Sequence, residues 1–224
     1  MNKEIKQRLI EIEDYLKGYL KEGKRFFASS SFQTHSIPML HVLNKIAPGF
    51  PIYFIDTGFH FPETLEFRDY IAEELSLNVM NQKGSIPLVN QLNSEDRFLF
   101  QSDPAYCCSI NKTQPMDSLM MQYDIWITGV RKDQNTNRSK MGYEAKGPHN
   151  TLRFHPMIHW NSKMIWEYRK IHNLPTHPLE AEGFLSIGCM PCTQKFSMEG
   201  EDGRGGRWKG MKKNECGLHT DLIK

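Results

Sequence analysis

Five cysteines carry the clearest chemistry in this sequence. Cys107 and Cys108 are adjacent, Cys189 and Cys192 are separated by two residues, and Cys216 stands apart from both pairs. An odd number of cysteines in a chain without a secretory signal does not indicate a disulfide framework. Two close pairs and one separate cysteine instead predict four metal ligands and one reactive thiol.

The two cysteine pairs suit a metal centre. The spacing Cys189-Met-Pro-Cys192 lets two thiolates reach one centre. The adjacent Cys107 and Cys108 need an irregular turn, because neighbouring side chains point apart on a regular helix or strand. A cubane iron–sulfur cluster offers separate iron atoms to four thiolates, but zinc is also held by four cysteines. A disulfide between the pairs is disfavoured in a reducing compartment. The spacing alone leaves an iron–sulfur cluster and zinc as alternatives.

Cys216 lies in the segment Glu215-Cys-Gly-Leu-His219, after a basic stretch that contains Arg204 and Arg207. Nearby cations favour the thiolate, which is the nucleophilic form of cysteine. We therefore predict that Cys216 is a nucleophile. The alternative is an unreactive cysteine that happens to follow several lysines.

A serine-rich segment, Ser29–Ser36, stands between a predicted strand and a predicted helix. Hydroxyl groups and the N–H groups at a helix N-terminus together form an anion site. The alternative is an ordinary strand-to-helix turn with a capping serine, because the glycines of a strict phosphate-binding loop are absent.

The elements that would position these residues alternate along the chain. Helical periodicity marks residues 2–21, the stretches that follow Ile37 and Pro62, and residues 161–171 with Asn161 as N-cap. Apolar runs predict strands over residues 26–28, 51–55, 77–80, 125–128 and 152–157. This alternation predicts an α/β fold, a parallel sheet with helices on both faces. The polar strand ends Ser29–Ser31, Asp56–Gly58 and Thr128–Arg131 would then border one crevice.

Composition narrows the class of protein. The 224 residues are 39% hydrophobic and 24% charged, and the net charge is +2 with scattered basic residues. Scattered charge argues against a nucleic-acid partner. The sequence contains neither an apolar run of about 18 residues nor a signal-peptide core, which predicts no membrane segment and a cytoplasmic protein. We expect residues 1–198 to form the nucleotide-binding domain and residues 199–224 a flexible arm with the reactive cysteine.

The chain resembles the reductases of adenosine 5′-phosphosulfate (APS) and of 3′-phospho-APS along nearly its whole length. The double cysteine, the later CxxC and the terminal Glu-Cys-Gly-Leu-His, in this order, are highly specific to that family. The other matching segments are Phe54–Gly58, Phe61–Thr64, Lys112, Trp126–Arg131, His177–Leu179, Ser186–Thr193 and Gly206–Trp208. One departure is the loop Ser31-Phe-Gln-Thr-His-Ser36, which lacks the glycine and the acidic residue that are usual in the family.

The resemblance implies a fold of the adenine nucleotide α-hydrolase (PP-loop) type. It implies a [4Fe–4S] cluster on Cys107, Cys108, Cys189 and Cys192, with Cys216 as the catalytic residue. Family members with both cysteine pairs generally prefer APS, so APS is the expected substrate. Related reductases are dimers or tetramers. The alternatives are a 3′-phospho-APS or dual-substrate reductase, an ATP-dependent sulfurtransferase or adenylating enzyme, and a zinc-stabilised nucleotide-binding or redox-sensing module.

The expected reaction begins when the Cys216 thiolate attacks the sulfur of APS and displaces AMP. Thioredoxin or a similar dithiol then releases sulfite from the S-sulfocysteine. Two anions meet in the first step, so the site needs cations. We expect these from Lys112, which could lie between cluster and substrate, and from Arg131, Arg204, Arg207 and His219. Adenosine is expected to contact Ser29, Ser30, Ser31, Thr57 and Gly58, with Phe32 packed against it.

Overall fold

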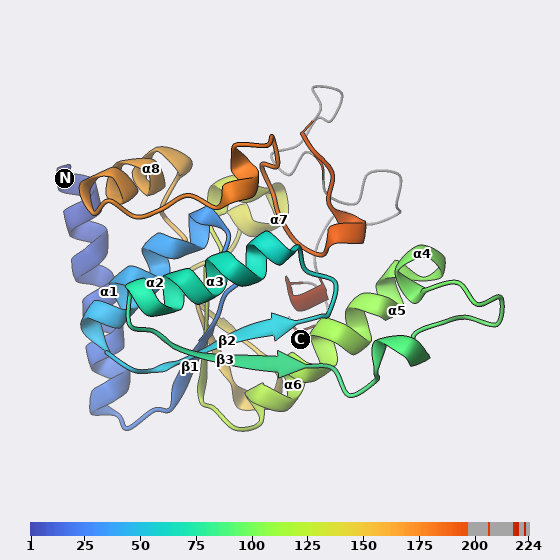
Figure 1. Cartoon of the computed structure of the whole chain (residues 1–224). Helices are drawn as coiled ribbons and strands as arrows, with labels where there is room; N and C mark the ends of the chain where they lie inside the picture. The colour runs from blue at the N-terminus through green and yellow to red at the C-terminus, as the bar shows by residue number, and fades with distance from the viewer. Residues whose placement is uncertain (197–205, 207–216, 220–221, 223–224) are drawn as a thin grey trace.

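The computed structural model describes residues 1–196, 206, 217–219 and 222. Its described strands form one six-stranded sheet in the order β3-β2-β1-β4-β6-β5 (Figure 1). All neighbouring strands pair in parallel except β5 and β6, which are antiparallel. The strands are β1 Phe26–Ser29, β2 Pro51–Asp56, β3 Asn78–Lys83, β4 Ile125–Thr128, β5 Glu144–Lys146 and β6 Leu152–Phe154. The α/β class predicted from the sequence is confirmed.

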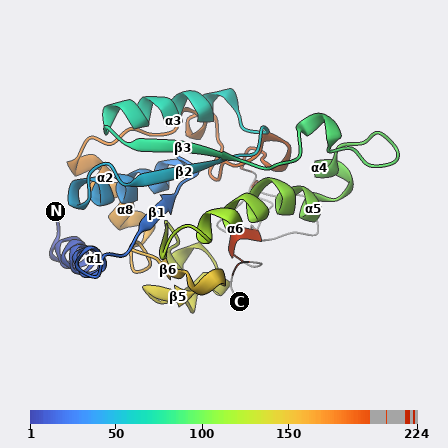
Figure 2. The same ribbon diagram turned by 90° about the horizontal axis from the view of Figure 1, so that it is seen from below.

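Helices cover both faces of the sheet (Figures 1 and 2). The longer ones are α1 Lys3–Lys21, α2 Ile37–Ile46, α3 Pro62–Glu74 and α8 Ser162–Ile171. Shorter ones are α4 Leu99–Ser102, α5 Pro104–Cys108, α6 Gln114–Met120 and α7 Thr136–Ser139. Among the described residues, no helix is both long and apolar enough to cross a membrane.

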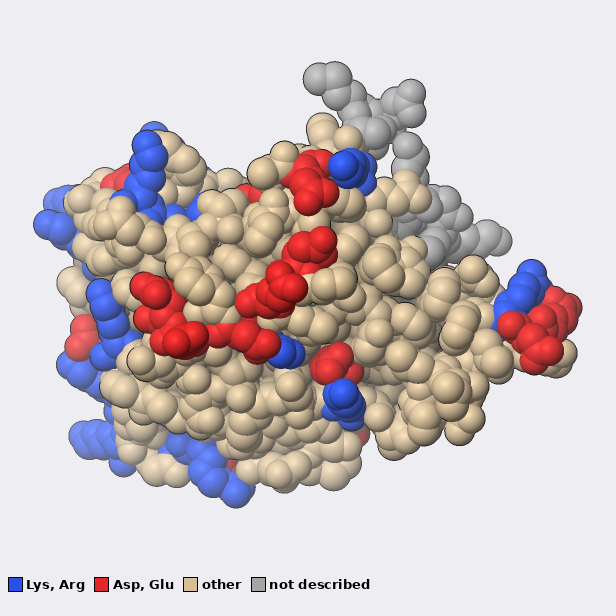
Figure 3. Space-filling model, viewed as in Figure 1, with Lys and Arg blue, Asp and Glu red and all other residues tan. Residues whose placement is uncertain are grey.

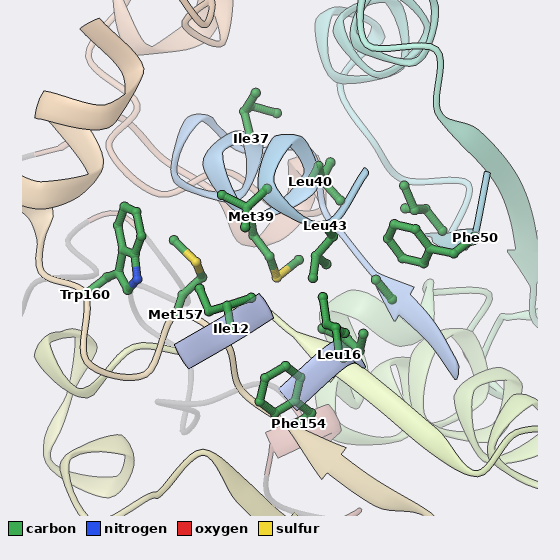
Figure 4. Close-up of a cluster of buried hydrophobic side chains, with 14 of the residues drawn as sticks. Ile12, Leu16, Ile37, Met39, Leu40, Leu43, Phe50, Phe154, Met157 and Trp160 are labelled. Carbon is green, nitrogen blue, oxygen red and sulfur yellow. The ribbon is translucent and has the colours of Figure 1, made fainter. Parts of the chain in front are cut away.

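Alternation along the strands explains the two covered faces, because successive side chains of a strand point to opposite sides. Ile52 and Phe54 of β2 belong to the larger core cluster, with side chains of α1, α2, α3 and α8. Tyr53, between them, belongs to a second cluster that contains residues of α6 and also Leu222. Figure 4 shows part of the larger cluster, where α1 and α2 side chains meet Phe154 of β6.

Most of the predicted elements are confirmed, including Asn161 as the N-cap of α8, whose side chain accepts from Met164 N–H. Strand 77–80 is longer than predicted, since β3 runs from Asn78 to Lys83, and strand 152–157 is shorter than predicted, since β6 ends at Phe154. The antiparallel strand β5 was not predicted, because Glu-Ala-Lys has no apolar pattern. The predicted domain boundary at residue 198 and most of the predicted arm, residues 199–224, lie outside the described residues.

Charge is distributed unevenly over the surface that faces the viewer in Figure 3. Acidic side chains form a row along α3 on this face, where Glu66, Asp69 and Glu73 are exposed. Basic side chains gather near α1 instead. Both signs therefore appear on one face, as the small net charge of +2 leads one to expect.

Candidate active site: a cationic cavity beside four cysteines

A cavity of about 340 Å³ opens beyond the carboxyl ends of β1 and β4. In open parallel sheets this is the edge where ligands bind, since the loops there are free to carry polar groups. Its wall consists mainly of the β1–α2 loop, the end of β4, the segment up to α7, the start of α3 and the segment 185–188. The lining residues that bear on the argument are Ser29, Ser30, Ser31, Gln33, His35, His60, Thr64, Lys112, Thr128, Arg131, Asp133, Arg138, Ser162, Ile187 and Leu218.

The β1–α2 loop lacks glycine but still contains a residue with a positive φ angle. Phe32 adopts a left-handed backbone conformation (φ 53°), which most side chains disfavour. The Ser30 hydroxyl accepts a hydrogen bond from Phe32 N–H at 3.1 Å and closes the turn. The Phe32 ring is fully buried and packs edge-on against Phe54 in the core. Phe32 is therefore a core residue of this loop and does not line the cavity where adenosine was expected to meet it.

Gln33, at the position after Phe32, links the loop to the CxxC segment. Its carbonyl oxygen accepts from Ile187 N–H at 2.9 Å, and its amide donates to Ser31 Oγ at 3.1 Å. On the other side of the loop, Ser29 Oγ accepts from the indole N–H of Trp126 on β4 at 2.8 Å. The hydroxyl of Ser29 is thus bonded by β4 and those of Ser30 and Ser31 by residues of the same loop, and all three serines line the cavity.

Arg131 supplies a buried positive charge to the cavity. The side chain is 5% exposed, and its Nε donates to Asp133 at 2.9 Å. Its Nη2 reaches Ser162 Oγ at 3.3 Å. Its Nη1 is buried and finds no hydrogen-bond acceptor within the described part of the chain. A guanidinium that lines a cavity with an unsatisfied N–H is suited to bind an oxyanion.

His35 and Thr128 add two more polar groups to the same wall. His35 Nδ1 and Thr128 Oγ1 are both buried without a hydrogen-bond partner among residues that the structure describes. Burial, together with the charges of Arg131 and Arg169, lowers the pKa of His35 to about 4. The imidazole is therefore neutral near pH 7, so its role there is that of a hydrogen-bonding group rather than of a cation.

All four predicted metal ligands meet in a second, smaller pocket. Cys107, Cys108, Cys189 and Cys192 line it together, and none of the four is in a disulfide within the described residues. Asn111 Nδ2 lies 3.6 Å from Cys107 Sγ, and Thr57 Oγ1 lies 3.3 Å from Cys189 Sγ.

An irregular helix brings the adjacent cysteines to this pocket. Helix α5 ends at Cys108 and continues as a π-helical turn, Ser109–Thr113, before α6 begins. Such wider turns are often found at functional sites. Both cysteines, however, lie in the last turn of the regular helix α5, so the irregular turn that was expected at the pair instead follows it. The CxxC segment is held against the loop after β2, because His60 and Cys189 form an isolated antiparallel bridge and Met190 N–H donates to Phe59 O at 2.7 Å.

The donor set could hold a cofactor with four thiolate ligands. Burial raises the pKa of Cys107 to about 11, and the three neighbouring cysteines add to the rise, although the hydrogen bond from Asn111 opposes it. Four thiolates so close together therefore require a compensating cation. A [4Fe–4S] cluster takes four cysteine ligands, so the residues fit that group. No set of three or more His, Cys, Asp or Glu side chains in the described residues has the geometry of a site for a metal ion.

Lys112 joins the two sites. It belongs to the π-helical turn and lines both the cavity and the cysteine pocket. Burial lowers the pKa of His60 to about 4, and the positive charge of Lys112 contributes to this decrease. The two sites thus share one ammonium group.

The structure brings together some of the residues predicted for the site and not others. Ser29, Ser30, Ser31, Arg131 and Lys112 line the cavity. Thr57 lies at the cysteine pocket instead. Gly58 has a left-handed backbone (φ 74°), and a Cβ there would lie 2.7 Å from Leu88 Cδ1, so its role is in the turn.

The predicted catalytic residues of the C-terminal arm are less fully described. Cys216, Arg204 and Arg207 lie outside the described residues. The backbone of His219 ends the 3-10 turn Gly217–His219, which lies beside the π-helical turn (Figures 1 and 2). Leu218, in this turn, lines the cavity.

Sequence reasoning missed several lining residues: Gln33, His35, His60, Thr64, Asp133 and Arg138. For Gln33 and His35 the signal was present, because the departure of their loop from the family pattern was visible in the sequence.

Comparison with known proteins defines the class. Residues 25–195 match the phosphoadenosine phosphosulfate reductase domain, and the chain belongs to this family. It is similar to an adenosine 5′-phosphosulfate reductase of Chelativorans sp. (strain BNC1), with 39% identity over 85% of this chain and 77% of the relative. It is also similar to a phosphoadenosine 5′-phosphosulfate reductase of Gloeobacter violaceus, with 36% identity over 88% and 83% of the two chains. Among solved structures, phosphoadenylyl-sulfate reductase of Candida auris has the same fold (TM-score 0.66, 17% identity, 85% of this chain and 96% of that one).

Proposed function

We propose that this protein reduces adenosine 5′-phosphosulfate to sulfite and AMP in assimilatory sulfate reduction, with a [4Fe–4S] cluster on its four paired cysteines. The observation that carries the proposal is the position of Lys112, which lines both the oxyanion-suited cavity and the pocket of the four thiols. Relatives named adenosine 5′-phosphosulfate reductase, at 33–39% identity, support the same substrate. The protein is further proposed to act in the cytoplasm, as a homodimer or homotetramer and without a nucleic-acid partner.

Cys107, Cys108, Cys189 and Cys192 would hold the cluster. When bound, it would add a compact charge beside Lys112 and tie the CxxC segment to the helix that carries the cysteine pair. The chain's own residues do the remaining work. Thr57 and Asn111 offer hydrogen bonds to two of the sulfur ligands and so fix their orientation.

Lys112 and Arg131 bind the phosphosulfate group in the cavity. The nucleophile and the substrate are both anionic, so their approach requires positive charge. One cation about 4 Å away stabilises an anion by about 1 kcal/mol in water and by about 4 kcal/mol at an effective dielectric of about 20. Because Arg131 is buried, the larger of these two values applies to its charge. Arg204, Arg207 and His219 are proposed to complete the cationic surroundings.

In the first step, the Cys216 thiolate attacks the sulfur of APS. The bond between that sulfur and the phosphate oxygen breaks, AMP leaves with the electron pair, and Cys216 becomes an S-sulfocysteine. Support for Cys216 comes from Leu218, which lines the cavity two residues further along the chain. Two residues span at most about 7 Å.

In the second step, a dithiol protein of the thioredoxin type supplies two electrons. One of its thiolates attacks Cys216 Sγ and displaces sulfite. The attack leaves a mixed disulfide between the dithiol protein and Cys216. Its second thiol resolves this disulfide and restores the Cys216 thiol. The proposed arm, residues 199–224, closes over APS in the first step and presents Cys216 to the dithiol in the second, while Leu222 near its end stays buried in the core cluster.

A second candidate is the reduction of 3′-phospho-APS. It is favoured by the similarity to a relative named phosphoadenosine 5′-phosphosulfate reductase. The buried Arg138 on the cavity wall offers a further cation for an additional phosphate.

Mass spectrometry of the intact, anaerobically purified protein tests the proposal. Incubation with APS and no thiol should leave a sulfonate on the Cys216 peptide, and reduced thioredoxin should remove it with release of sulfite. The Cys216→Ser variant is the matched control and should remain unmodified. An adduct formed only with 3′-phospho-APS would favour the second candidate. No adduct with either compound would refute the covalent mechanism, and zinc without iron or sulfide would refute the cluster.

A further inference from the structure

His177 is a buried histidine between two walls of the cavity, and nothing proposed so far uses it. The side chain is fully buried, with a relative exposure of 0%. Its backbone N–H donates to Thr34 Oγ1 in the β1–α2 loop at 2.9 Å. Its ring Nε2 lies 3.1 Å from Thr64 Oγ1, on the first turn of α3. The ring also packs against Phe67, with centroids 5.0 Å apart.

The hydrogen bonds of His177 determine which ring nitrogen carries the proton. His177 is the N-cap of the 3-10 turn Pro178–Glu180, and its Nδ1 accepts from Leu179 N–H at 3.3 Å. Nδ1 must therefore present a lone pair. Burial lowers the pKa of His177 to about 4, so the ring is neutral near pH 7. The single proton then sits on Nε2, which donates to Thr64 Oγ1.

With the proton on His177 Nε2, the Thr64 hydroxyl accepts from His177 and its own proton points away from that ring. Thr64 Oγ1 accepts from His177, and within the described residues no acceptor for its own proton is found. Thr64 lines the cavity and is 2% exposed. A buried hydroxyl that must donate, and that borders a ligand cavity, is satisfied by an acceptor of the ligand.

We propose that His177 is a positioning residue, which fixes the Thr64 hydroxyl as a hydrogen-bond donor to the adenine nucleotide in the cavity. The inference rests on the proposed function in assuming that the ligand is an adenine nucleotide. The acceptor is an oxygen or ring nitrogen of that nucleotide. The hydrogen bond from Leu179 N–H to His177 Nδ1 thus determines that the Thr64 hydroxyl donates to the nucleotide.

The first test compares two substitutions of Thr64 in the full chain loaded with its metal cofactor. Thr64→Val keeps the shape but lacks the hydroxyl, and Thr64→Ser restores it. AMP binding, measured by calorimetry, should weaken about tenfold in Thr64→Val, and Thr64→Ser should recover most of the loss. Adenosine is the second probe. Equal losses for adenosine and AMP assign the contact to the nucleoside, whereas a loss confined to AMP assigns it to the phosphate.

The second test separates the two nitrogens of His177. His177→Asn retains an acceptor near the position of Nδ1 and loses the donor to Thr64. His177→Gln retains a donor near the position of Nε2 and loses the cap on Leu179. We expect AMP to bind about tenfold more weakly to the Asn variant than to the Gln variant. A purely structural role of His177 predicts no such difference at matched thermal stability.

Two results would overturn the inference: wild-type AMP affinity in a folded Thr64→Val variant, or equal AMP affinity in the two His177 variants. Failure of the proposed function is a separate outcome. It would appear as an unmodified wild-type protein in the APS experiment, or as wild-type protein that binds no AMP. A double variant, Thr64→Val with His177→Asn, should bind AMP no more weakly than Thr64→Val alone, since the two residues act through one hydroxyl.

Discussion

Gln33 offers a test of whether the β1–α2 loop and the CxxC segment depend on one another. Its side chain bridges them, because Oε1 accepts from Ile187 N–H and Nε2 donates to Ser31 Oγ. Ile187 is buried, with 2% exposure. Replacement of Gln33 by alanine therefore leaves a backbone N–H without its acceptor in a poorly hydrated position.

The size of the effect follows from these two hydrogen bonds. The bond to the exposed Ser31 contributes little, because water replaces it. Loss of the acceptor for Ile187 N–H costs about 1 to 2 kcal/mol. In a chain of this length each kcal/mol lowers the melting temperature by about 2 to 4 °C. Gln33→Ala should thus melt about 2 to 8 °C below the wild type.

A matched variant separates stability from binding. Gln33→Glu keeps an acceptor for Ile187 N–H but adds a negative charge to the cavity wall. It should retain the melting temperature. At about 8 Å and an effective dielectric of about 20, two like charges repel by about 2 kcal/mol, so kcat/KM for APS should fall about 30-fold. Gln33→Ala should lose stability and keep most of its kcat/KM.

Thermal unfolding followed by circular dichroism and sulfite release with excess thioredoxin are the two assays. The reasoning fails if Gln33→Ala melts within about 1 °C of the wild type. It also fails if Gln33→Glu melts as low as Gln33→Ala, because the acceptor for Ile187 N–H would then have no value. An unchanged kcat/KM in Gln33→Glu would show that residue 33 does not face the bound anion.

Three further predictions concern charge, metal and pH. Arg131→Lys keeps the charge but not the planar set of donors, so kcat/KM for APS should fall about 10- to 100-fold, and a near-wild-type value would contradict the anion site. Cys192→Ser should lower the iron and sulfide content of the purified protein, whereas Cys216→Ser should not; equal contents in both would exclude Cys192 as a ligand. Burial lowers the pKa of His155 to about 4, so between about pH 6.5 and pH 4 the unfolded chain binds a proton that the folded chain excludes. Stability should therefore fall by about 1.4 kcal/mol per pH unit for this group as the pH decreases through that window. Urea midpoints that stay level there would contradict the burial of a neutral His155.

The sequence predicted the fold well where hydrophobic periodicity governs. The strands β1, β2 and β4 were located because each contains an apolar run that is buried in the sheet. The bounds of β3 were predicted less well because it is partly exposed and polar. Strand β5 was missed because a short edge strand is stabilised by its partner β6 rather than by its own side chains. The helices α4 to α7 were likewise not predicted, since most have fewer residues than two helical turns.

The positions of the site residues were predicted only in part. Motif spacing was sufficient to group the four cysteines, which line one pocket. The positions of Phe32 and Thr57 depend on backbone turns that the sequence does not reveal: a left-handed residue turns the Phe32 ring into the core, and the turn after β2 directs Thr57 toward Cys189. Arg138 and Asp133 lie on an irregular segment, so no periodicity indicated that they face the cavity.

Leu222 and Leu218 have a consequence for how often the proposed nucleophile meets its substrate. Leu222 is buried, with 4% exposure, in the cluster that also contains Phe27 and Trp126, and Leu218 packs against that cluster. The chain is therefore held in place by residues that follow Cys216 in the sequence. It is also held before Cys216, where Gln194 N–H donates to Gly206 O. A group tethered close to its target acts at an effective concentration in the millimolar range or above. Transfer of the sulfonate to the proposed nucleophile is accordingly expected to be an encounter within one molecule, whose frequency does not fall when the protein is diluted.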